Sequence, residues 1–328
     1  MKEFESCPKV YRIEFEVSER PTNSVLLFQN PWEVNLSDSF QSYVLREFLL
    51  QEDLCNSIYF LGKNATLPFP LFEKMDNVKA IYTGKLPETG EFFTQTIWCN
   101  TLYLGVSLND AHYKEFHNPI LLQDLLVSQT FQRNFIYKSF GFYAKDEESQ
   151  RSLSRSGMEC TGDLNPCILL GILDKYLNPK FTTKNELDLL YVYRTDSDLE
   201  KGSLITDLGV SDLTVSLEVS ATTGEVAKLK LIEDLIDKIL RAKIVITSDQ
   251  NVSAMAMSLG KHVLKGPNLF DNYTLAPEKI LDLTDKEDFA SAQTTIRDRQ
   301  FELAKVLRDF LLLESGEKMS LIQGSYRK

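Results

Sequence analysis

The sequence lacks any run of about 18 or more apolar residues, which is the length that a membrane-spanning helix needs. Its first residues, MKEFESCPKVYRIEFEV, also lack the apolar segment of a secretory leader. Positive charge is scarce, because 36 Lys and Arg stand against 47 Asp and Glu and the formal net charge is −11. This balance argues against a nucleic-acid backbone as the general partner. We therefore expect a soluble, cytoplasmic protein with no membrane span and no nucleic-acid partner.

Cysteine and histidine are also few. The five cysteines lie far apart and form no C-x-x-C pair, which favours reduced thiols over a disulfide framework or a zinc site. His112 and His117 are five residues apart with no evident third ligand, and His262 begins an expected strand. The sequence therefore predicts neither a metal site nor a bound cofactor.

What the sequence does contain is an alternation of short apolar runs and longer stretches of helical spacing. Continuous apolar runs are typical of parallel strands that are covered on both faces. The first set of expected strands is 24–28, 57–62, 78–82, 101–106 and 140–144, with helical spacing in 37–51 and 120–140. The pattern restarts with expected strands 188–194, 213–219, 242–248, 262–266 and 279–283, and an amphipathic helix at 225–241.

Two consecutive sets of alternating strands and helices predict an α/β protein with two doubly wound, Rossmann-like domains. The best linker is the polar segment 177–187, which contains Pro179. We expect an N-terminal domain over residues 1–178 and a C-terminal domain over residues 179–328. The final helix, in 288–315, is long enough to pack against either domain.

In open α/β sheets, ligands bind beyond the carboxyl ends of the strands. Asn35 to Asp38 follow the first strand and open a helix, where free N–H groups favour an anion. The alternative is a capping segment, with Ser37 or Asp38 as the N-cap. Lys145 follows a strand in the same way and either faces a cleft with Asp146 or belongs to a solvated helix start.

The second half offers similar candidates. Arg194 ends a strand and either points into a cleft or forms a loop ion pair with nearby aspartates. Asp249 follows the strand IVITS and is either a site carboxylate or an N-cap, and Ser253 could cap the following helix. His112 could supply an imidazole to the site, although a loop histidine without a chemical role is the alternative.

The order and form of these segments resemble the polysaccharide pyruvyltransferase family, whose members transfer a pyruvyl group from phosphoenolpyruvate to a sugar. Residues 25–48 resemble its first strand and N-x-G-D segment, with Ser37 at the glycine position. Residues 101–110 keep Gly105 of a Gly-rich turn. Residues 140–166 resemble a strand, a basic-acidic pair and a Ser-containing helix, with Lys145 where Arg is usual. Residues 231–266 resemble the segment with a T-D-R-L-H loop, where Ser248 to Asn251 stand without the expected Arg and His.

The resemblance implies a transferase with two domains facing across a cleft, as in GT-B enzymes, that uses phosphoenolpyruvate and a glycan acceptor of the cell surface or its precursor. Pyruvyl transfer needs cationic or N–H donors for the phosphate and carboxylate, and a group that exchanges a proton. The candidate catalytic residues are Asp38, His112, Lys145 and Asp249. The candidate substrate-binding residues are Asn35, Gly105, Arg194, Gln250, Asn251 and Ser253.

Asn251 can hydrogen-bond to a substrate but cannot exchange a proton. Two other functions therefore stay open. One is a GT-B glycosyltransferase with a nucleotide-sugar donor, and the other is a catalytically inactive relative that binds a glycan or a protein.

Overall fold

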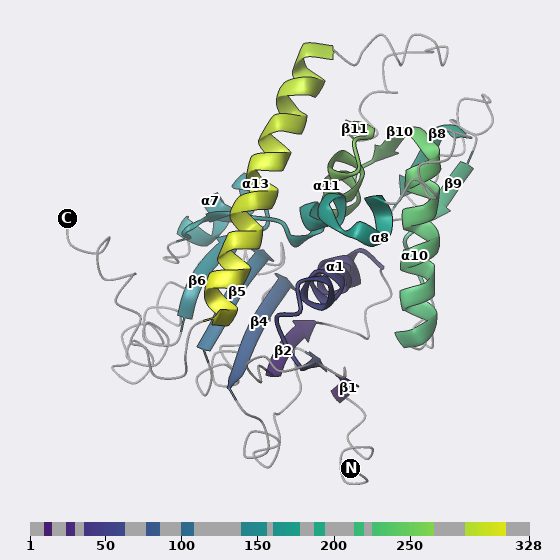
Figure 1. Ribbon diagram of the computed structural model, residues 1–328. Coiled ribbons are helices and arrows are strands. Elements are labelled where there is room, and N and C mark those ends of the chain that lie inside the picture. Colours follow the sequence, from purple (N-terminus) through teal and green to yellow (C-terminus); the bar gives the residue numbers. More distant parts are fainter. Residues whose placement is uncertain are drawn as a thin grey trace. The chain divides into compact units, whose positions relative to one another are not determined.

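Figure 1 shows the computed structural model of the chain. It describes residues 10–14, 24–29, 36–62, 77–85, 100–107, 139–155, 160–177, 187–193, 213–219, 225–265 and 286–312. The chain divides into two compact units, each built from separate segments. Unit 1 contains Met1–Pro31, Glu52–Pro166 and Lys305–Lys328, and unit 2 contains Trp32–Gln51 and Cys167–Ala304.

In its described residues, unit 1 forms a seven-stranded sheet in the order β1-β3-β2-β4-β5-β6-β7. The strands are β1 (Val10–Glu14), β2 (Ser24–Gln29), β3 (Ser57–Gly62), β4 (Val78–Lys85), β5 (Asn100–Ser107), β6 (Ser139–Ala144) and β7 (Gly162–Asp163). All neighbours are parallel except β1, which pairs antiparallel with β3. From β2 onward the chain adds β3 on one side and β4 on the other, so the sheet is doubly wound with a switch point between β2 and β4.

An aromatic ladder crosses this sheet. Its four rings belong to neighbouring strands, with centroids 5.6, 5.8 and 5.1 Å apart, and they come from Phe28, Tyr82, Tyr103 and Phe142. All four side chains are buried. Paired registers bring these rings into line, so the ladder fixes the alignment of β2, β4, β5 and β6.

Two helices complete the described part of unit 1. Helix α7 (Glu147–Arg155) follows β6, and the last residues of α13 (Lys286–Leu312) also belong to this unit. Lys79 of β4 is fully buried, and its ammonium group donates to the carbonyl oxygens of Phe310 and Leu311 at the end of α13. Arg308 pairs with Glu52 at 2.6 Å. The end of α13 is therefore fixed by polar contacts within unit 1.

The described residues of unit 2 form a four-stranded parallel sheet in the order β11-β10-β8-β9. Its elements are α1 (Ser37–Gln51), the 3-10 helix η1 (Pro166–Ile172) from its second residue on, α8 (Asp174–Leu177), β8 (Leu187–Tyr193), β9 (Leu213–Ser216), α10 (Glu225–Arg241), β10 (Ala242–Thr247), α11 (Gln250–Ser258), β11 (His262–Lys265) and the first part of α13. The chain adds β9 on one side of β8 and β10 on the other. The two units thus share one winding order, and the switch point of unit 2 lies between β8 and β10.

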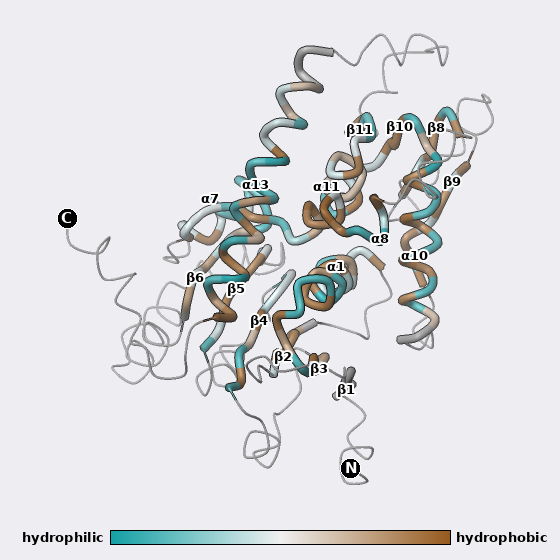
Figure 2. Tube along the Cα trace, in the orientation of Figure 1, coloured by the Kyte–Doolittle hydropathy of each residue, from teal (hydrophilic) through white to brown (hydrophobic). Residues whose placement is uncertain are grey.

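Apolar side chains form the core of unit 2. One cluster consists of Leu189, Tyr191, Ile244, Ile246 and Leu264, which come from three adjacent strands. Helix α10 is banded in Figure 2, because hydrophobic and hydrophilic residues alternate along it at helical spacing. Such a helix covers a sheet with one face and meets solvent with the other.

The predicted fold class, an α/β protein with two parallel, Rossmann-like sheets, is confirmed. The predicted helices at 37–51 and 225–241 coincide with α1 and α10. The expected strand at 279–283 and residues 120–138 of the expected helical stretch lie outside the described residues, whereas Ser139 and Phe140 begin β6 and are not helical. Most of the predicted linker also lies outside the described residues, and the division at residues 178 and 179 stays a prediction. No helix in the described part of the chain has the length and apolar character to cross a membrane.

Candidate functional site

The segment Asp249–Ser253 follows β10, one of the two strands that border the switch point of unit 2. Asp249 follows the end of β10 and is the N-cap of α11, with an extended backbone (φ −80°, ψ 124°). Its Oδ1 accepts the N–H groups of Asn251 and Val252 at 2.9 and 3.0 Å. Only 4% of Asp249 is exposed. The carboxylate therefore satisfies two of the N–H groups that a helix start leaves without an internal partner.

Ser253 does not cap this helix, and that prediction was wrong. Its N–H donates to the carbonyl oxygen of Asp249 at 2.9 Å, which is a helical i to i+4 bond. Ser253 therefore lies in the first full turn, buried, with its hydroxyl directed to the sulfur of Met257 at 3.8 Å. The cap falls four residues earlier because Asp249 leaves the strand with an extended backbone.

The first turns of α1 and α11 lie side by side within unit 2. The side-chain amide of Asn251 donates to the carbonyl oxygen of Ser37 at 2.9 Å and to its hydroxyl at 3.1 Å. Gln41, one turn further along α1, donates to Oδ1 of Asn251 at 3.4 Å. Asn251 and Ser37 are both buried. Two segments that the sequence separates by 214 positions thus form one polar junction.

The other candidates of unit 2 lie around this junction or outside the described residues. Gln250 is exposed at the first position of α11. Asp38 is the second residue of α1, and only its backbone is described. Arg194 directly follows β8 but, like Asn35, lies outside the described residues.

Gly105 and Lys145 belong to unit 1. Gly105 has a φ of +64°, which a residue with a side chain adopts only with strain, and it lies where the register of β5 against β6 shifts. The N–H of Lys145 donates to the carbonyl oxygen of Val106 at 2.9 Å. Lys145 and Val106 therefore lie together at the carboxyl edge of the sheet. His112, the remaining candidate, lies outside the described residues.

Asp146 is a residue that the sequence pairs with Lys145 but that was not among the candidates. Its Oδ1 accepts the N–H of Ser149 at 2.7 Å and so caps α7. Its Oδ2 is buried and has no hydrogen-bond partner. An unpaired carboxylate oxygen at the carboxyl edge of a parallel sheet is suited to accept a hydroxyl proton or an N–H group. The Asp-x-x-Ser spacing gives the cap, whereas nothing in the sequence indicates the unpaired oxygen.

His262 begins β11, at the amino end of the strand, and burial lowers the pKa of its imidazole. It therefore lies at the opposite end of the strands from Asp249. Within the described ranges, no group of three or more His, Cys, Asp and Glu side chains is arranged to hold a metal ion.

Comparison with known proteins gives distant likenesses only. No family model matches the chain, and no curated protein matches it. Among solved structures, a functionally uncharacterized protein, KP1_0663 from Klebsiella pneumoniae, is 13% identical with a TM-score of 0.44, over 80% of this chain and 88% of that one. An alpha-glucosyltransferase (AGT) in complex with UDP is 7% identical with a TM-score of 0.30, over 89% of this chain and 95% of that one. These likenesses assign no function to the chain.

Proposed function

We propose that the chain is a transferase that binds an anionic donor at the joined first turns of α1 and α11, and that this donor is phosphoenolpyruvate. The observation that carries the proposal is the pair of hydrogen bonds from Asn251 to Ser37. They join the two segments that resemble the N-x-G-D segment and the T-D-R-L-H loop of polysaccharide pyruvyltransferases. The segment at the start of α11 follows β10, which borders the switch point of the sheet of unit 2, and α/β proteins bind ligands at such a point.

The reaction would form a ketal on a glycan that offers two hydroxyl groups. Both hydroxyl oxygens bond to the carbon that carries the phosphate ester, the bond from that carbon to the ester oxygen breaks, and inorganic phosphate leaves. One hydroxyl proton goes to the methylene carbon, which becomes a methyl group, and the other goes to the phosphate. Gln250 is exposed and does not titrate, so its part is to hold the donor, whereas the buried Asn251 holds the two first turns together. Asp38, His112, Lys145 and Asp249 stay the predicted catalytic residues, and His112 is the imidazole among them.

A thermal-shift titration tests the donor. A ligand that binds only the folded state raises the melting temperature by mass action. We expect phosphoenolpyruvate to raise it, and we expect Gln250→Glu to reduce the shift because the new carboxylate repels the anion. The charge-matched control is Thr295→Glu, an exposed position on α13 in the same unit, which should keep the full shift.

The same titration includes nucleoside diphosphates. A shift with a nucleotide and none with phosphoenolpyruvate would refute pyruvyl transfer and favour the glycosyltransferase. No shift with either ligand would favour the catalytically inactive relative. One observation supports that last function: the side chains of Asp249 and Asn251 are both engaged in holding α11 and α1.

A further inference from the structure

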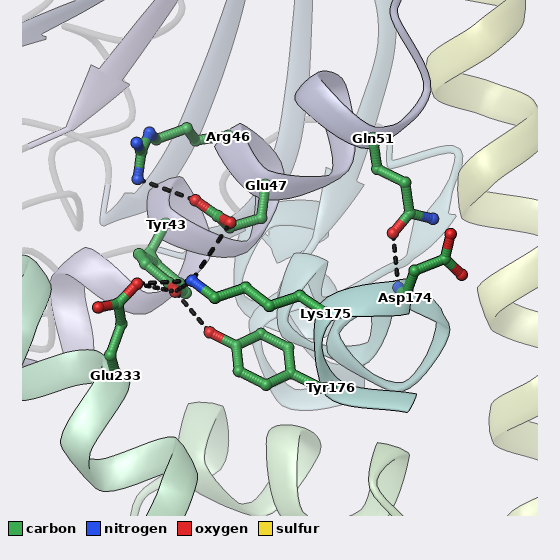
Figure 3. A network of polar contacts seen from close by, with 8 residues as sticks. All are labelled: Tyr43, Arg46, Glu47, Gln51, Asp174, Lys175, Tyr176 and Glu233. Atoms are coloured by element: carbon green, nitrogen blue, oxygen red, sulfur yellow. Dashed lines mark hydrogen bonds and ion pairs between the residues drawn. The ribbon is translucent and has the colours of Figure 1, made fainter. Parts of the chain in front are cut away.

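Helix α1 carries a polar face that contacts other elements of unit 2. Tyr43, Arg46, Glu47 and Gln51 recur at helical spacing on this face, opposite residues of α8 and α10 (Figure 3). We call the group formed by Tyr43, Glu47, Lys175, Tyr176 and Glu233 the α1 network. Three of its five members carry charge, and Tyr43 contacts two of these charged groups.

Lys175 lies at the centre of the α1 network. Its ammonium nitrogen is 2.6 Å from Glu233 Oε1, 3.3 Å from the hydroxyl of Tyr43 and 3.7 Å from Glu47 Oε2. The Tyr43 hydroxyl donates to Glu233 at 3.1 Å and lies 2.5 Å from the hydroxyl of Tyr176. With its proton on Glu233, Tyr43 accepts from both Tyr176 and Lys175. Each polar group thus has a partner from another helix.

The pKa shifts of Lys175 and Glu233 both favour their ion pair. The hydrogen bond from Lys175 lowers the pKa of Glu233. Burial alone would lower the pKa of Lys175, but the bond to Glu233 and the neighbouring carboxylate of Glu47 outweigh it and raise that pKa. Burial and the contact with Tyr176 raise the pKa of Tyr43, which stays a neutral phenol. The ion pair at the centre of the network is therefore favoured by the environment of both its members.

Contacts at both ends of α1 complete its attachment. At the last turn, the side chain of Gln51 donates to the carbonyl oxygen of Ile172 at 3.1 Å and accepts the N–H of Asp174 at 2.7 Å. At the start, the N–H of Leu36 donates to the carbonyl oxygen of Leu217 at 2.8 Å. Helix α1 is thus attached to unit 2 at its start, middle and end, although the strands before and after it, β2 and β3, belong to unit 1.

We propose that Lys175 and Tyr43 are positioning residues for the donor site, because they hold α1 in the orientation that keeps Ser37 against Asn251. This inference rests on the proposed function. Tyr43 is six residues from Ser37, or about 9 Å along the helix axis, so the network acts on the first turn through the helix and not by touching the donor. Because continuous backbone hydrogen bonds make a 15-residue helix stiff, we expect a loss of support in its middle to change the placement of its first turn.

The experiment compares Lys175→Met with two other variants. Lys175→Met keeps the aliphatic stem but removes the charge that joins Glu233, Glu47 and Tyr43, and Lys175→Arg restores a cation. Lys243→Met is the matched control, because it also breaks a lysine ion pair within unit 2, the one with Asp188 between β10 and β8. Two quantities are measured on the full chain: hydrogen exchange of the backbone amides at residues 37–41, and the Kd for phosphoenolpyruvate by calorimetry.

We expect Lys175→Met to increase exchange at residues 37–41 about tenfold and to raise the Kd about tenfold, while Lys175→Arg and Lys243→Met stay close to the wild type. Unchanged exchange in Lys175→Met would overturn the inference whether or not the donor binds. Faster exchange with an unchanged Kd would also overturn it, since the network would then stabilise the fold only. If the wild type does not bind phosphoenolpyruvate, the donor assignment fails, and faster exchange in Lys175→Met still supports the positioning of α1.

Discussion

Replacing Asn251 by Asp tests the junction between α1 and α11 most directly. The two side chains have the same shape, but aspartate carries an oxygen where asparagine has its N–H donors. That oxygen would face the carbonyl oxygen of Ser37, which now accepts at 2.9 Å, and the hydroxyl at 3.1 Å. The site is 4% exposed, so water cannot solvate the new charge.

The size of the effect follows from the hydrogen bonds. Asn251→Ala removes the two bonds to Ser37 and the bond from Gln41 at a buried position, for a loss of about 2 kcal/mol. Asn251→Asp adds an unpaired buried carboxylate, for a loss of about 4 kcal/mol. Gln250→Ala, next in sequence but exposed, is the control and should cost less than about 0.5 kcal/mol.

The measurement is hydrogen exchange under native conditions, followed in α1 and α11, with α7 of unit 1 as the internal reference. Exchange reports the opening free energy of α1 and α11 separately from that of unit 1, so the result holds even if the chain unfolds in more than one step. The loss in Asn251→Asp should shrink as the pH falls, because burial raises the pKa of the new carboxyl and its protonation in the folded state restores stability. If the opening free energies of α1 and α11 in both Asn251 variants lie within about 0.5 kcal/mol of those in the wild type, the stabilising role of the junction is refuted.

Three other changes have expected outcomes. Gly171→Ala should lower the free energy of unfolding by about 3 kcal/mol in denaturant unfolding, because the new Cβ would lie 2.1 Å from the carbonyl oxygen of Ser258. Gly260→Ala, at a φ of +74° with nothing near its Cβ, should lower it by about 1 kcal/mol. Equal losses in the two variants would contradict the close approach at Gly171. Burial lowers the pKa of Lys79 from 10.5 to about 8, so between these pH values the unfolded chain keeps the proton that the folded chain has lost. As the pH rises from 8 to 10.5, the free energy of unfolding of the wild type should therefore increase by up to about 3 kcal/mol relative to that of Lys79→Met. A stability difference between wild type and Lys79→Met that does not change with pH would disprove the lowered pKa of Lys79. Tyr103→Leu, which removes a ring from the middle of the aromatic ladder, should lower the free energy of unfolding by about 2 kcal/mol. A loss below about 0.5 kcal/mol would mean that the ladder does not stabilise the sheet.

The fold could be predicted because the parallel strands carry the pattern that their burial demands. The run SVLLF is apolar without alternation, and its residues Val25–Phe28 are fully buried in β2. Strand β1 was not predicted, because VYRIE is short and its apolar residues are interrupted by Arg12; its strand partner is β3, more than 40 positions later in the chain. Lys79 could not have been predicted to be buried either, since its partners are carbonyl oxygens that lie 231 and 232 positions further along the chain.

The candidate site divides in a similar way. Asp249 was located correctly after β10 because a polar residue that follows an apolar strand and precedes a helix has few other roles. The partner of Asn251 was not foreseen, since no local pattern relates it to Ser37. The α1 network was missed for the same reason: Tyr43, Lys175 and Glu233 carry no motif, and their meeting depends on the tertiary fold alone.

The attachment of α1 to unit 2 has a consequence for synthesis of the chain. The contact partners of Tyr43 and Ser37 follow 132 and 214 positions later, at Lys175 and Asn251. At a translation rate of about 5–20 residues per second, α1 would leave the ribosome roughly 10–40 s before its last partner is made. A 15-residue helix is marginal in water by itself, so during this interval its apolar side chains, Phe40 and Phe48 among them, are without their final cover. Nascent chains that end before residue 251 are therefore expected to be clients of chaperones.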